Sequence, residues 1–520
     1  MTSRASFTPF DIVKDIWTHL DLPPSALSSL SLPGINGASE QTLRPVIPSS
    51  FKIGHLAQGT IALSALGAAV AHSALSRTPA STSGGGGGIP RTVVPLRHAV
   101  LEFQCERLYT LAGKPPAETW GPIGRLHPTA DGHVRIHDAF PHHRRGALAL
   151  LGLPETCADR AAVGARTQRW GSAELETVAV EEKGLAIYAL RSFDEWDATA
   201  QARAVAELPV SVRRVDIPFS SVSPPPRGRV SKSSNRCLAG LRVLELSRVI
   251  AAPVAGKTLA AHGADVLWVT SPHLPDLPGL DREFARGKRS IRLDLDYSAA
   301  DRAKLLSLAG SADVVVQGYR PGSLAARGLN VEELGRANPG IIVANLSAFG
   351  PEGPWKDRRG FDSLVQACSG INVAEAAAYG GGGGGGVSRA LPCQALDHGA
   401  GYLLAAGVCA AVYHREKDRA AGRSVGAYVV DVSLAAVGKY LRSLGQFEGR
   451  SGFEGGDWTA LGDGGSEERT KEEKTLFETR HTPFGEMMFL KHSANLEGFE
   501  PGWDRMPSLL GSDEAVWDDE

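Results

Sequence analysis

Residues 390–415 read A-L-P-C-Q-A-L-D-H-G-A-G-Y-L-L-A-A-G-V-C-A-A-V-Y-H-R, and this stretch predicts the helix around which the chain is organised. Asp397 precedes a long apolar segment that is rich in alanine and glycine. A carboxylate in the first turn of a helix is favoured by the helix dipole, and the glycines at 399 and 401 leave room for a ligand. Asp397 is therefore a candidate nucleophile. The alternative is an ordinary N-cap aspartate that opens a buried helix.

Length and composition indicate a globular protein with a large core. The chain has 520 residues, enough for two or three domains, with 42% hydrophobic and 22% charged residues. Its net charge of -2 gives no overall attraction to nucleic acid or to an anionic membrane. Any anionic ligand must therefore be held by local groups.

The six cysteines show no metal or disulfide pattern. They lie at 105, 157, 237, 368, 393 and 409, without a C-x-x-C pair, and are typical of reduced thiols. The histidines at 133, 137, 142 and 143 suggest a metal site, but no carboxylate or cysteine joins them at ligand spacing. We therefore expect no metal and no tightly bound cofactor.

The cellular location is predicted only by default. The apolar run 61–75 is too short to cross a bilayer and reads as a buried helix. The first residues lack the pattern of a signal peptide, and the last residues, V-W-D-D-E, are no peroxisomal signal. We expect a cytoplasmic protein, with mitochondrial and peroxisomal locations left open.

The first 220 residues show scattered elements and two linkers. Helices are predicted over 10–20, 53–75, 93–111 and 198–208, and a strand over 132–136. The run S-T-S-G-G-G-G-G at 81–88 is typical of a linker. The Pro- and Ser-rich stretch 220–234 is the best domain boundary in the chain.

After that boundary, strands and helices alternate. Strands are expected at 241–246, 264–269, 289–295, 313–317 and 341–346, with helices at 254–262, 299–308 and 331–337 between them. This order predicts an α/β fold with a parallel, doubly wound sheet whose ligand lies at the carboxyl ends of the strands. No G-x-G-x-x-G and no P-loop motif is present, so a dinucleotide or a P-loop nucleotide is not expected.

A series of motifs between about 236 and 440 resembles the class III CoA-transferase (CaiB/BaiF) family. They are L-R-V-L-E-L-S-R-V-I-A-A-P (241–253), H-G-A-D-V-L-W-V (262–269), R-G-K-R-S-I-R-L-D-L (286–295), A-D-V-V-V-Q-G-Y-R-P-G-S-L (312–324), N-P-G-I-I-V-A-N-L-S-A-F-G-P-E-G-P-W (338–355), G-F-D-S-L-V-Q-A-C-S-G (360–370) and the stretch around Asp397. The resemblance implies a Rossmann-like large domain with a smaller α+β domain. In that family two chains interlock as a ring-through-ring dimer.

The resemblance also implies a reaction and a set of residues. Asp397 would be the nucleophile that takes the acyl group from an acyl-CoA thioester as a mixed anhydride and then becomes an aspartyl-CoA thioester. CoA would be a substrate, and the second substrate a small carboxylic acid. The CoA-contacting positions implied are Val249, Ile250, Ala251, Lys288, Arg289, Tyr319, Arg320 and Phe349.

Two alternatives to a transferase stay open. Racemases of the family use a histidine in a G-H-D segment, and Phe361 stands at that position here, which favours the transferase. His398 follows Asp397, but neighbouring helix residues diverge by about 100°, so we expect it to point elsewhere. A 2-methylacyl-CoA racemase-like isomerase and a non-catalytic acyl-CoA-binding scaffold are the alternatives. Ser271 and Gly318 depart from residue types more usual in the family and favour the scaffold.

An internal repeat is predicted because residues 55–72 resemble 397–414, with His55 at the position of Asp397. We divide the chain into a degenerate N-terminal repeat with a small-domain-like segment (1–220), a linker (221–236), a large domain (237–450), and a polar linker followed by a C-terminal completion of the large domain (451–520). The chain would form an intramolecular pseudo-dimer or a homodimer. The glycine run 380–386 reads as a tolerated insertion, with a lid over the site as the alternative.

Overall fold

The structure is a computed structural model, and it describes residues 2–34, 45–76, 88–217, 235–380, 386–424, 426–454 and 471–518. Most of the predicted linkers at 81–88 and 221–236 lie outside these ranges, as do most of the glycine run and residues 455–470. The expectations for those segments stay predictions.

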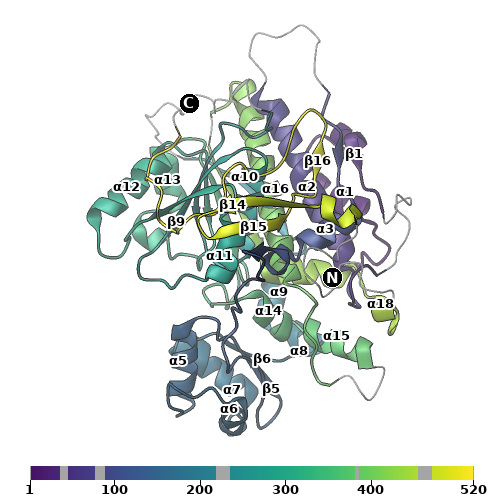
Figure 1. The fold of residues 1–520 in the computed structure, drawn as a ribbon, viewed down its shortest axis with the longest axis vertical. Coiled ribbons are helices and arrows are strands. Elements are labelled where there is room, and N and C mark those ends of the chain that lie inside the picture. Colours follow the sequence, from purple (N-terminus) through teal and green to yellow (C-terminus); the bar gives the residue numbers. More distant parts are fainter. Residues whose placement is uncertain are drawn as a thin grey trace.

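A seven-stranded sheet forms the centre of the larger part of the molecule (Figure 1). Its order is β10 (Lys288–Arg292), β9 (Asp265–Thr270), β8 (Arg242–Leu246), β11 (Val314–Gln317), β12 (Ile342–Ser347), β13 (Ala427–Ser433) and β7 (Val210–Val215). The first six strands run parallel, and β7 pairs antiparallel with β13 at the edge. The predicted parallel α/β sheet is confirmed, and its last strand comes from the first 220 residues.

Alternate residues of these strands belong to two separate cores. Val243, Val314 and Val316 join the core that contains the long helices, whereas Leu244 and Val315 join the core on the other face. This period of two follows from strand geometry. Both faces are covered, which explains why the strands read as apolar runs.

The helices that follow the strands occupy both faces of the sheet. They are α10 (Ala251–Ala261), α11 (Pro278–Phe284), α12 (Ala299–Gly310), α13 (Val331–Ala337), α14 (Asp362–Cys368), α15 (Ile371–Gly380), α16 (Ala395–Ala420), α17 (Leu434–Ser443) and α18 (Ser451–Glu454), with a 3₁₀ turn at Ala325–Arg327. Leu305 of α12 and Leu334 of α13 pack into the second core. The larger core holds α10, α16 and α17.

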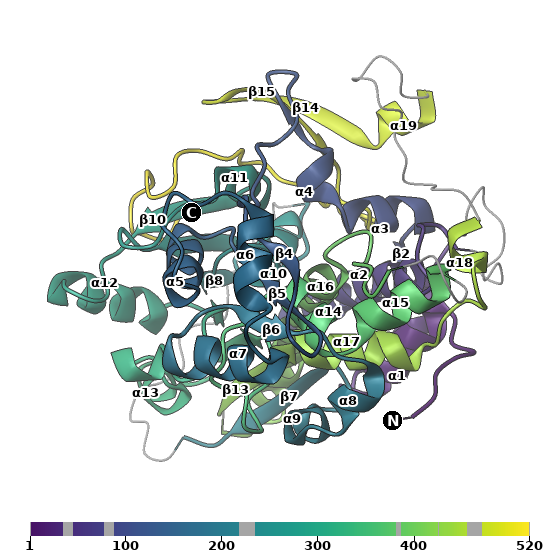
Figure 2. The ribbon, with the colours of Figure 1, turned by 90° about the horizontal axis from the view of Figure 1, so that it is seen from below.

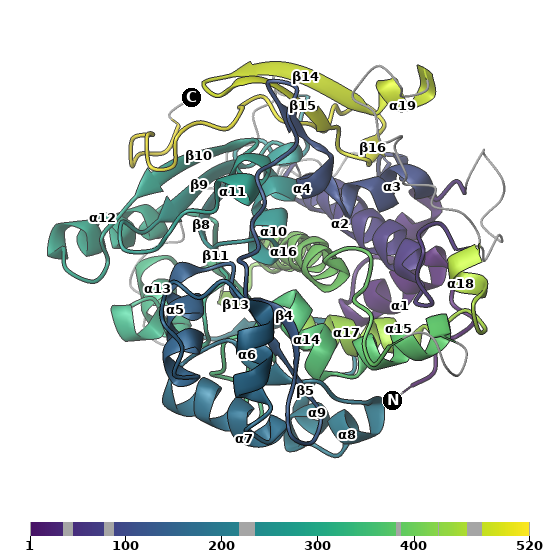
Figure 3. The ribbon, with the colours of Figure 1, turned by 60° about the horizontal axis from the view of Figure 1, so that its bottom comes forward.

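The most extensive contact between two helices in the described residues joins the two halves of the chain. α2 (Ile53–Leu75) lies beside α16 (Figure 3), and both are buried along their whole apolar length. A Cβ at Gly67 would lie 3.2 Å from the Cβ of Cys409, so the small residue allows the close approach. Both helices have the length and apolar composition of a membrane span, but both lie inside the protein. His55 and Asp397 are each the third residue of their helix, while the internal repeat itself stays a prediction.

A small α+β unit projects from the body at the bottom of Figure 1 and faces the viewer in Figure 2. It consists of β4 (Arg125–Pro128), β5 (His133–Ile136), β6 (Ile187–Ala189), α5 (Pro141–Leu150), α6 (Arg160–Thr167), α7 (Ser172–Thr177) and a π-helical turn at Val178–Glu182. Its antiparallel sheet has its own apolar core. The smaller α+β domain expected from the resemblance therefore comes from within residues 1–220.

The remaining elements wrap the N- and C-terminal segments around the body. They are α1 (Pro9–His19), the 3₁₀ turn Pro24–Ser29, β1 (Leu30–Ser31), β2 (Thr92–Val93), α3 (Leu96–Glu102), α4 (Cys105–Leu108), β3 (Thr110–Leu111), α8 (Phe193–Asp197), α9 (Ala200–Ala204), α19 (Lys471–Thr475), β14 (Phe477–Thr482), β15 (Gly485–Leu490) and β16 (Asn495–Leu496). β14 and β15 lie far from the small unit, at the top of Figure 2.

Three sequence predictions differ from these elements. The helix expected over 93–111 is divided into α3, α4 and β3, because β3 hydrogen-bonds to β15 near the C-terminus. The helix expected over 198–208 is only α9. The strands around 481–491 join β3 in a separate sheet and do not extend the large sheet, although Asp513 and Trp517 dock beside β10 and α12.

The close packing of α16 gives a stability prediction. A Cβ at Gly401 would lie 2.5 Å from the backbone oxygen of Ala251 and 2.5 Å from Cβ of Val254, so Gly401→Ala must push α16 away from α10. We expect the free energy of unfolding to fall by about 1–3 kcal/mol, measured by chemical denaturation. Gly310→Ala is the control, because a Cβ there meets nothing within 4 Å. Equal stability of the two variants would contradict the packing.

Candidate functional site

Two cavities meet at Asp397, in front of the carboxyl ends of the strands. The first has a volume of about 380 Å³, and we call it the arginine cavity because Arg248, Arg320, Arg327, Arg358 and Arg359 line it. Its other walls include Val249, Ile250, Ala251, Ser271, Gly318 and Tyr319. The ligand position expected for a parallel sheet therefore coincides with a real cavity.

Three of the five arginines have no acidic partner in the described part of the chain. Arg327 pairs with Asp296, and Arg358 with Glu176 and Glu181, whereas Arg248, Arg320 and Arg359 form no ion pair. Burial and then the nearby charge of Arg320 lower the pKa of Arg359. Positive charge without a counter-ion at a cavity wall favours an anionic ligand, and arginine suits phosphate.

The backbone at the start of α10 is strained where it lines the cavity. Val249 has a φ of 72°, in the left-handed region that β-branched residues rarely adopt. This turn directs the chain from β8 into α10, whose N-terminus lies at the cavity wall. The helix dipole adds positive potential at that wall.

The second cavity lies on the other side of Asp397 and has a volume of about 410 Å³. It shares Phe140, Val249, Ile250, Phe361 and Asp397 with the arginine cavity. Its further walls come from residues 106–120, from α11, and from the loop before α16. Asp397 thus stands where the two cavities join.

Asp397 is a buried carboxyl held in place by a second carboxyl. Its backbone N–H and that of Leu396 donate to Oδ2 of Asp362, at 3.0 and 2.8 Å. In the described part of the chain no donor reaches the carboxylate of Asp397 itself. Burial, then the charges of Asp362 and Glu106, raise the pKa of Asp397 well above its ordinary value, and burial raises the pKa of Asp362 to about 6.

Histidines of the small unit reach this site. The ring of His137 stacks on Phe361 with a centroid distance of 3.9 Å and lines the second cavity, while His142 and His143 line the arginine cavity. Nδ1 of His137 and of His143 has no hydrogen-bond partner among the residues that the structure describes, and burial lowers the pKa of both rings. Nε2 of His398 lies 3.0 Å from Oε2 of Glu106, so this ring is paired with another carboxylate, while its expected direction away from Asp397 stays a prediction.

The structure assembles six of the nine predicted site residues. Val249, Ile250, Ala251, Tyr319, Arg320 and Asp397 line the arginine cavity, while their roles stay predictions. Lys288, Arg289 and Phe349 line neither cavity, and here the expectation is corrected. Lys288 is buried 2.8 Å from Glu245, Arg289 pairs with Asp265, and Phe349 packs on Trp355.

Sequence reasoning did not assign Arg248, Arg359 or Asp362 to this site, and it considered the histidines of the small unit only as possible metal ligands. Arg248 lies two residues after the last residue of β8, so its place near a strand end was a usable signal. Asp362 follows Phe361 in the motif used to argue against a racemase. Nothing in the sequence indicated that His137, His142 and His143 would meet Asp397, because they lie on a different unit.

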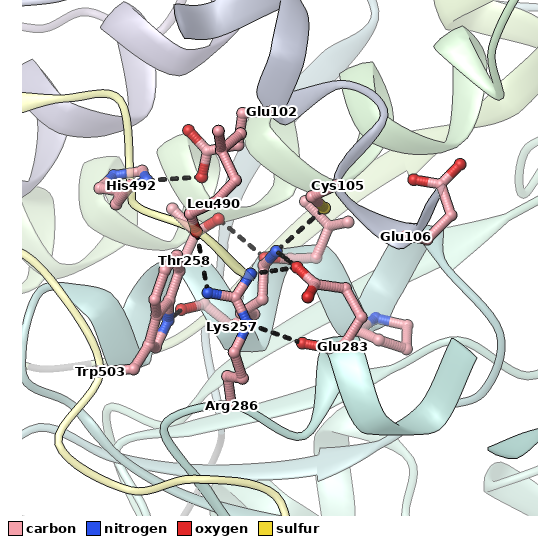
Figure 4. Close-up of polar contacts among 12 residues, drawn as sticks. Glu102, Cys105, Glu106, Lys257, Thr258, Glu283, Arg286, Leu490, His492 and Trp503 are labelled. Carbon is pink, nitrogen blue, oxygen red and sulfur yellow. Dashed lines mark hydrogen bonds and ion pairs between the residues drawn. The ribbon is translucent and has the colours of Figure 1, made fainter. Parts of the chain in front are cut away.

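A buried polar cluster anchors the wall of the second cavity (Figure 4). Nζ of Lys257 lies 2.9 Å from Glu283 and 3.2 Å from Sγ of Cys105, and Arg286 contacts Glu283 and the backbone oxygen of Leu490. The cluster thus fixes α4 against α10, α11 and the C-terminal segment. Breaking a buried pair of this kind costs about 3–5 kcal/mol.

The same region contains the closest approach to a metal site in the described residues. Ligand atoms of Cys105, Glu106 and His398 lie within 4.8 Å of one another. The ammonium of Lys257 beside the sulfur would repel a cation, and Glu106 and His398 already bind each other. The three residues are explained as part of the polar cluster.

The sequence is similar to one family of known proteins. A sequence model of CoA-transferase family III matches residues 238–455. An acyl-CoA transferase of Gibberella moniliformis is 32% identical over 307 residues, which are 56% of this chain and 52% of that protein. A probable fatty acyl-CoA transferase of Mycobacterium tuberculosis is 36% identical over 213 residues, 38% of this chain and 52% of that protein. The chain spans about half the length of these relatives.

Solved structures of this kind also match. A crystal structure of a hypothetical protein from Mycobacterium tuberculosis is 32% identical with a TM-score of 0.34, covering 39% of this chain and 57% of that one. A CaiB/BaiF family protein from Brucella suis is 27% identical with a TM-score of 0.35, covering 40% of this chain and 55% of that one.

The raised pKa of Asp397 gives a prediction about stability and pH. The folded state binds this proton more tightly than the unfolded chain, so the stability gained from the neutral form is lost as pH rises through the folded pKa. Asp397→Asn, which stays neutral, should melt at a higher temperature than the parent at pH 7.5, with a smaller difference at pH 5. Glu497→Gln, at an exposed site, is the control in thermal melts. A lower melting temperature for Asp397→Asn at pH 7.5 would refute the assignment.

Proposed function

Residues 238–455 belong to CoA-transferase family III, and we propose on this basis that the protein moves CoA between carboxylic acids with Asp397 as nucleophile. The observation that carries the proposal is the position of Asp397. It is a buried carboxyl at the junction of two cavities, and three of the five arginines that line one of them have no acidic partner among the described residues. Desolvation makes an ionised carboxylate a stronger nucleophile than it is in water.

The reaction balances without an added cofactor. The Asp397 carboxylate attacks the thioester carbon, the CoA thiolate leaves, and a mixed anhydride forms. The thiolate then attacks the aspartyl carbonyl carbon, which releases the first acid and leaves an aspartyl-CoA thioester. The acceptor carboxylate displaces CoA from that thioester as a second anhydride, and return of the thiolate to the new acyl carbon releases the product and restores Asp397.

The arginine cavity supplies the binding energy for CoA in this proposal. Its arginines and the N-terminus of α10 face the phosphates, as the strand-end position suits an anionic ligand.

The nucleophile is tested by trapping. The protein is incubated with acyl-CoA thioesters and labelled free acids, then treated with hydroxylamine and analysed by mass spectrometry. We expect exchange of label into acyl-CoA and a hydroxamate at Asp397, both lost in Asp397→Asn, with Glu497→Gln unchanged. Exchange that persists in Asp397→Asn would exclude Asp397. Proton exchange at C2 of the acyl group in heavy water, without transfer, would favour the racemase-like isomerase.

The CoA side is tested at Arg320, which is exposed at the cavity mouth and has no acidic partner among the described residues. Arg320→Met should raise KM for the CoA thioester by about tenfold and leave kcat within about twofold, since a charge-assisted hydrogen bond contributes about 1.5–3 kcal/mol. The difference should shrink at high salt. Arg336→Met, on the exposed side of α13, is the matched control. An equal KM in both variants would remove Arg320 from the CoA site.

A further inference from the structure

The two cavities that meet at Asp397 have opposite charge. Five arginines and two aspartates line the arginine cavity. The second cavity is lined by four carboxylates, Glu106, Glu118, Asp362 and Asp397, and by one cation, Arg107. Because CoA carries several phosphate charges, its place is the arginine cavity, and the acyl group beyond the thioester must then extend into the second cavity.

Arg107 is the one arginine or lysine among the described residues that line the second cavity, and only neutral oxygens accept its hydrogen bonds. The guanidinium of Arg107 donates to Oε1 of Gln104 and to the backbone oxygen of Pro392. Glu106 is bound to His398, and Glu118 accepts from the backbone of Thr119 and Trp120. Among the described residues of this cavity, carboxylates therefore outnumber the one arginine, and a second carboxylate on the acyl group would add to that excess of acidic groups.

The rest of the second cavity suits an apolar chain. Its larger side chains are Trp120, Phe140, Leu277, Leu280, Phe361 and Leu391. The volume of about 410 Å³ is within the range of pockets that enclose a ligand of several carbon atoms. Binding of an apolar acyl chain against these walls is favoured because apolar ligand surface is removed from water.

Much of this cavity is built by residues that the family match does not include. Residues 106–120 and 137–140 lie before the matched segment 238–455, and the buried cluster of Figure 4 fixes their first part, at Cys105 and Glu106, against the large sheet domain. Both halves of the chain therefore shape this cavity: the N-terminal half supplies Trp120 and Phe140, and the matched segment supplies Leu280 and Leu391 together with Asp397.

We propose that the second cavity is the acyl subsite and that it selects uncharged, apolar acyl groups over dicarboxylic ones. The predicted preference in turnover rests on the proposed CoA-transferase function, whereas the predicted preference in binding does not require that the protein transfers CoA. The acyl chain lies against Trp120, Leu280 and Leu391, with its thioester carbon at Asp397. Succinyl and glutaryl groups would be disfavoured by their second carboxylate.

The first experiment compares hexanoyl-CoA with succinyl-CoA. Binding of each to full-length Asp397→Asn is measured by calorimetry, and kcat/KM of each with the parent protein by mass spectrometry. We expect hexanoyl-CoA to be favoured on the order of a hundredfold, because a like charge in a closed site costs several kcal/mol. Equal or tighter binding of succinyl-CoA would overturn the inference and leave the transferase function intact. Preferential hexanoyl-CoA binding without any transfer would support the subsite and refute the transferase function.

A pair of variants at Ala117 tests the charge argument. Ala117 is exposed and lies on the wall of the second cavity, so a longer side chain has room there. Ala117→Lys adds a cation, and Ala117→Met adds similar length without charge. We expect Ala117→Lys to improve succinyl-CoA relative to hexanoyl-CoA by about threefold compared with Ala117→Met, as for an exposed ion pair. The same ratio in both variants would contradict the proposed place of the acyl group.

Discussion

The packing of α2 against α16 is the contact on which the rest of the structure depends. α2 and the segment 399–412 of α16 are apolar on almost all sides, and such helices are stable only when they are enclosed. α16 carries Asp397 in its first turn and lies against the sheet through α10 and β13, while α2 brings the first half of the chain to it. Because both helices are rigid and fully packed, the nucleophile position is set by the core of the molecule and not by a loop.

Asp362 has two opposing effects on Asp397. Asp362 caps the start of α16 and orients it, yet its carboxyl raises the pKa of Asp397 together with burial. The empty site is thus held in an electrostatically unfavourable state near neutral pH. Three arginines of the arginine cavity have no acidic partner among the described residues, so an anion bound there would neutralise their charge without stabilising the ionised Asp397.

The sequence predicted the regular part of the fold well. Alternating apolar strands and helices from 241 onward gave the parallel sheet, because both periodicities are local properties of the chain. Contacts between distant segments could not be read in the same way. β3 pairs with β15, and this pairing interrupts a helix that was predicted from the sequence. Lys288 forms an ion pair with Glu245, so Lys288 does not lie at the expected phosphate site. His137 belongs to the small unit, yet its ring stacks on Phe361. In each case the partner lies far away in sequence.

The antiparallel strand β7 closes one edge of the sheet, and this has a consequence for how the chain acquires its structure. β7 and α2 are synthesised long before β13 and α16, the elements that they pair with. Until those appear, β7 lacks the strand that it pairs with, and α2 lacks its most extensive contact although α1 and α3 can already pack on it. The face of α2 that α16 later covers is therefore exposed to aggregation while the second half of the chain is synthesised.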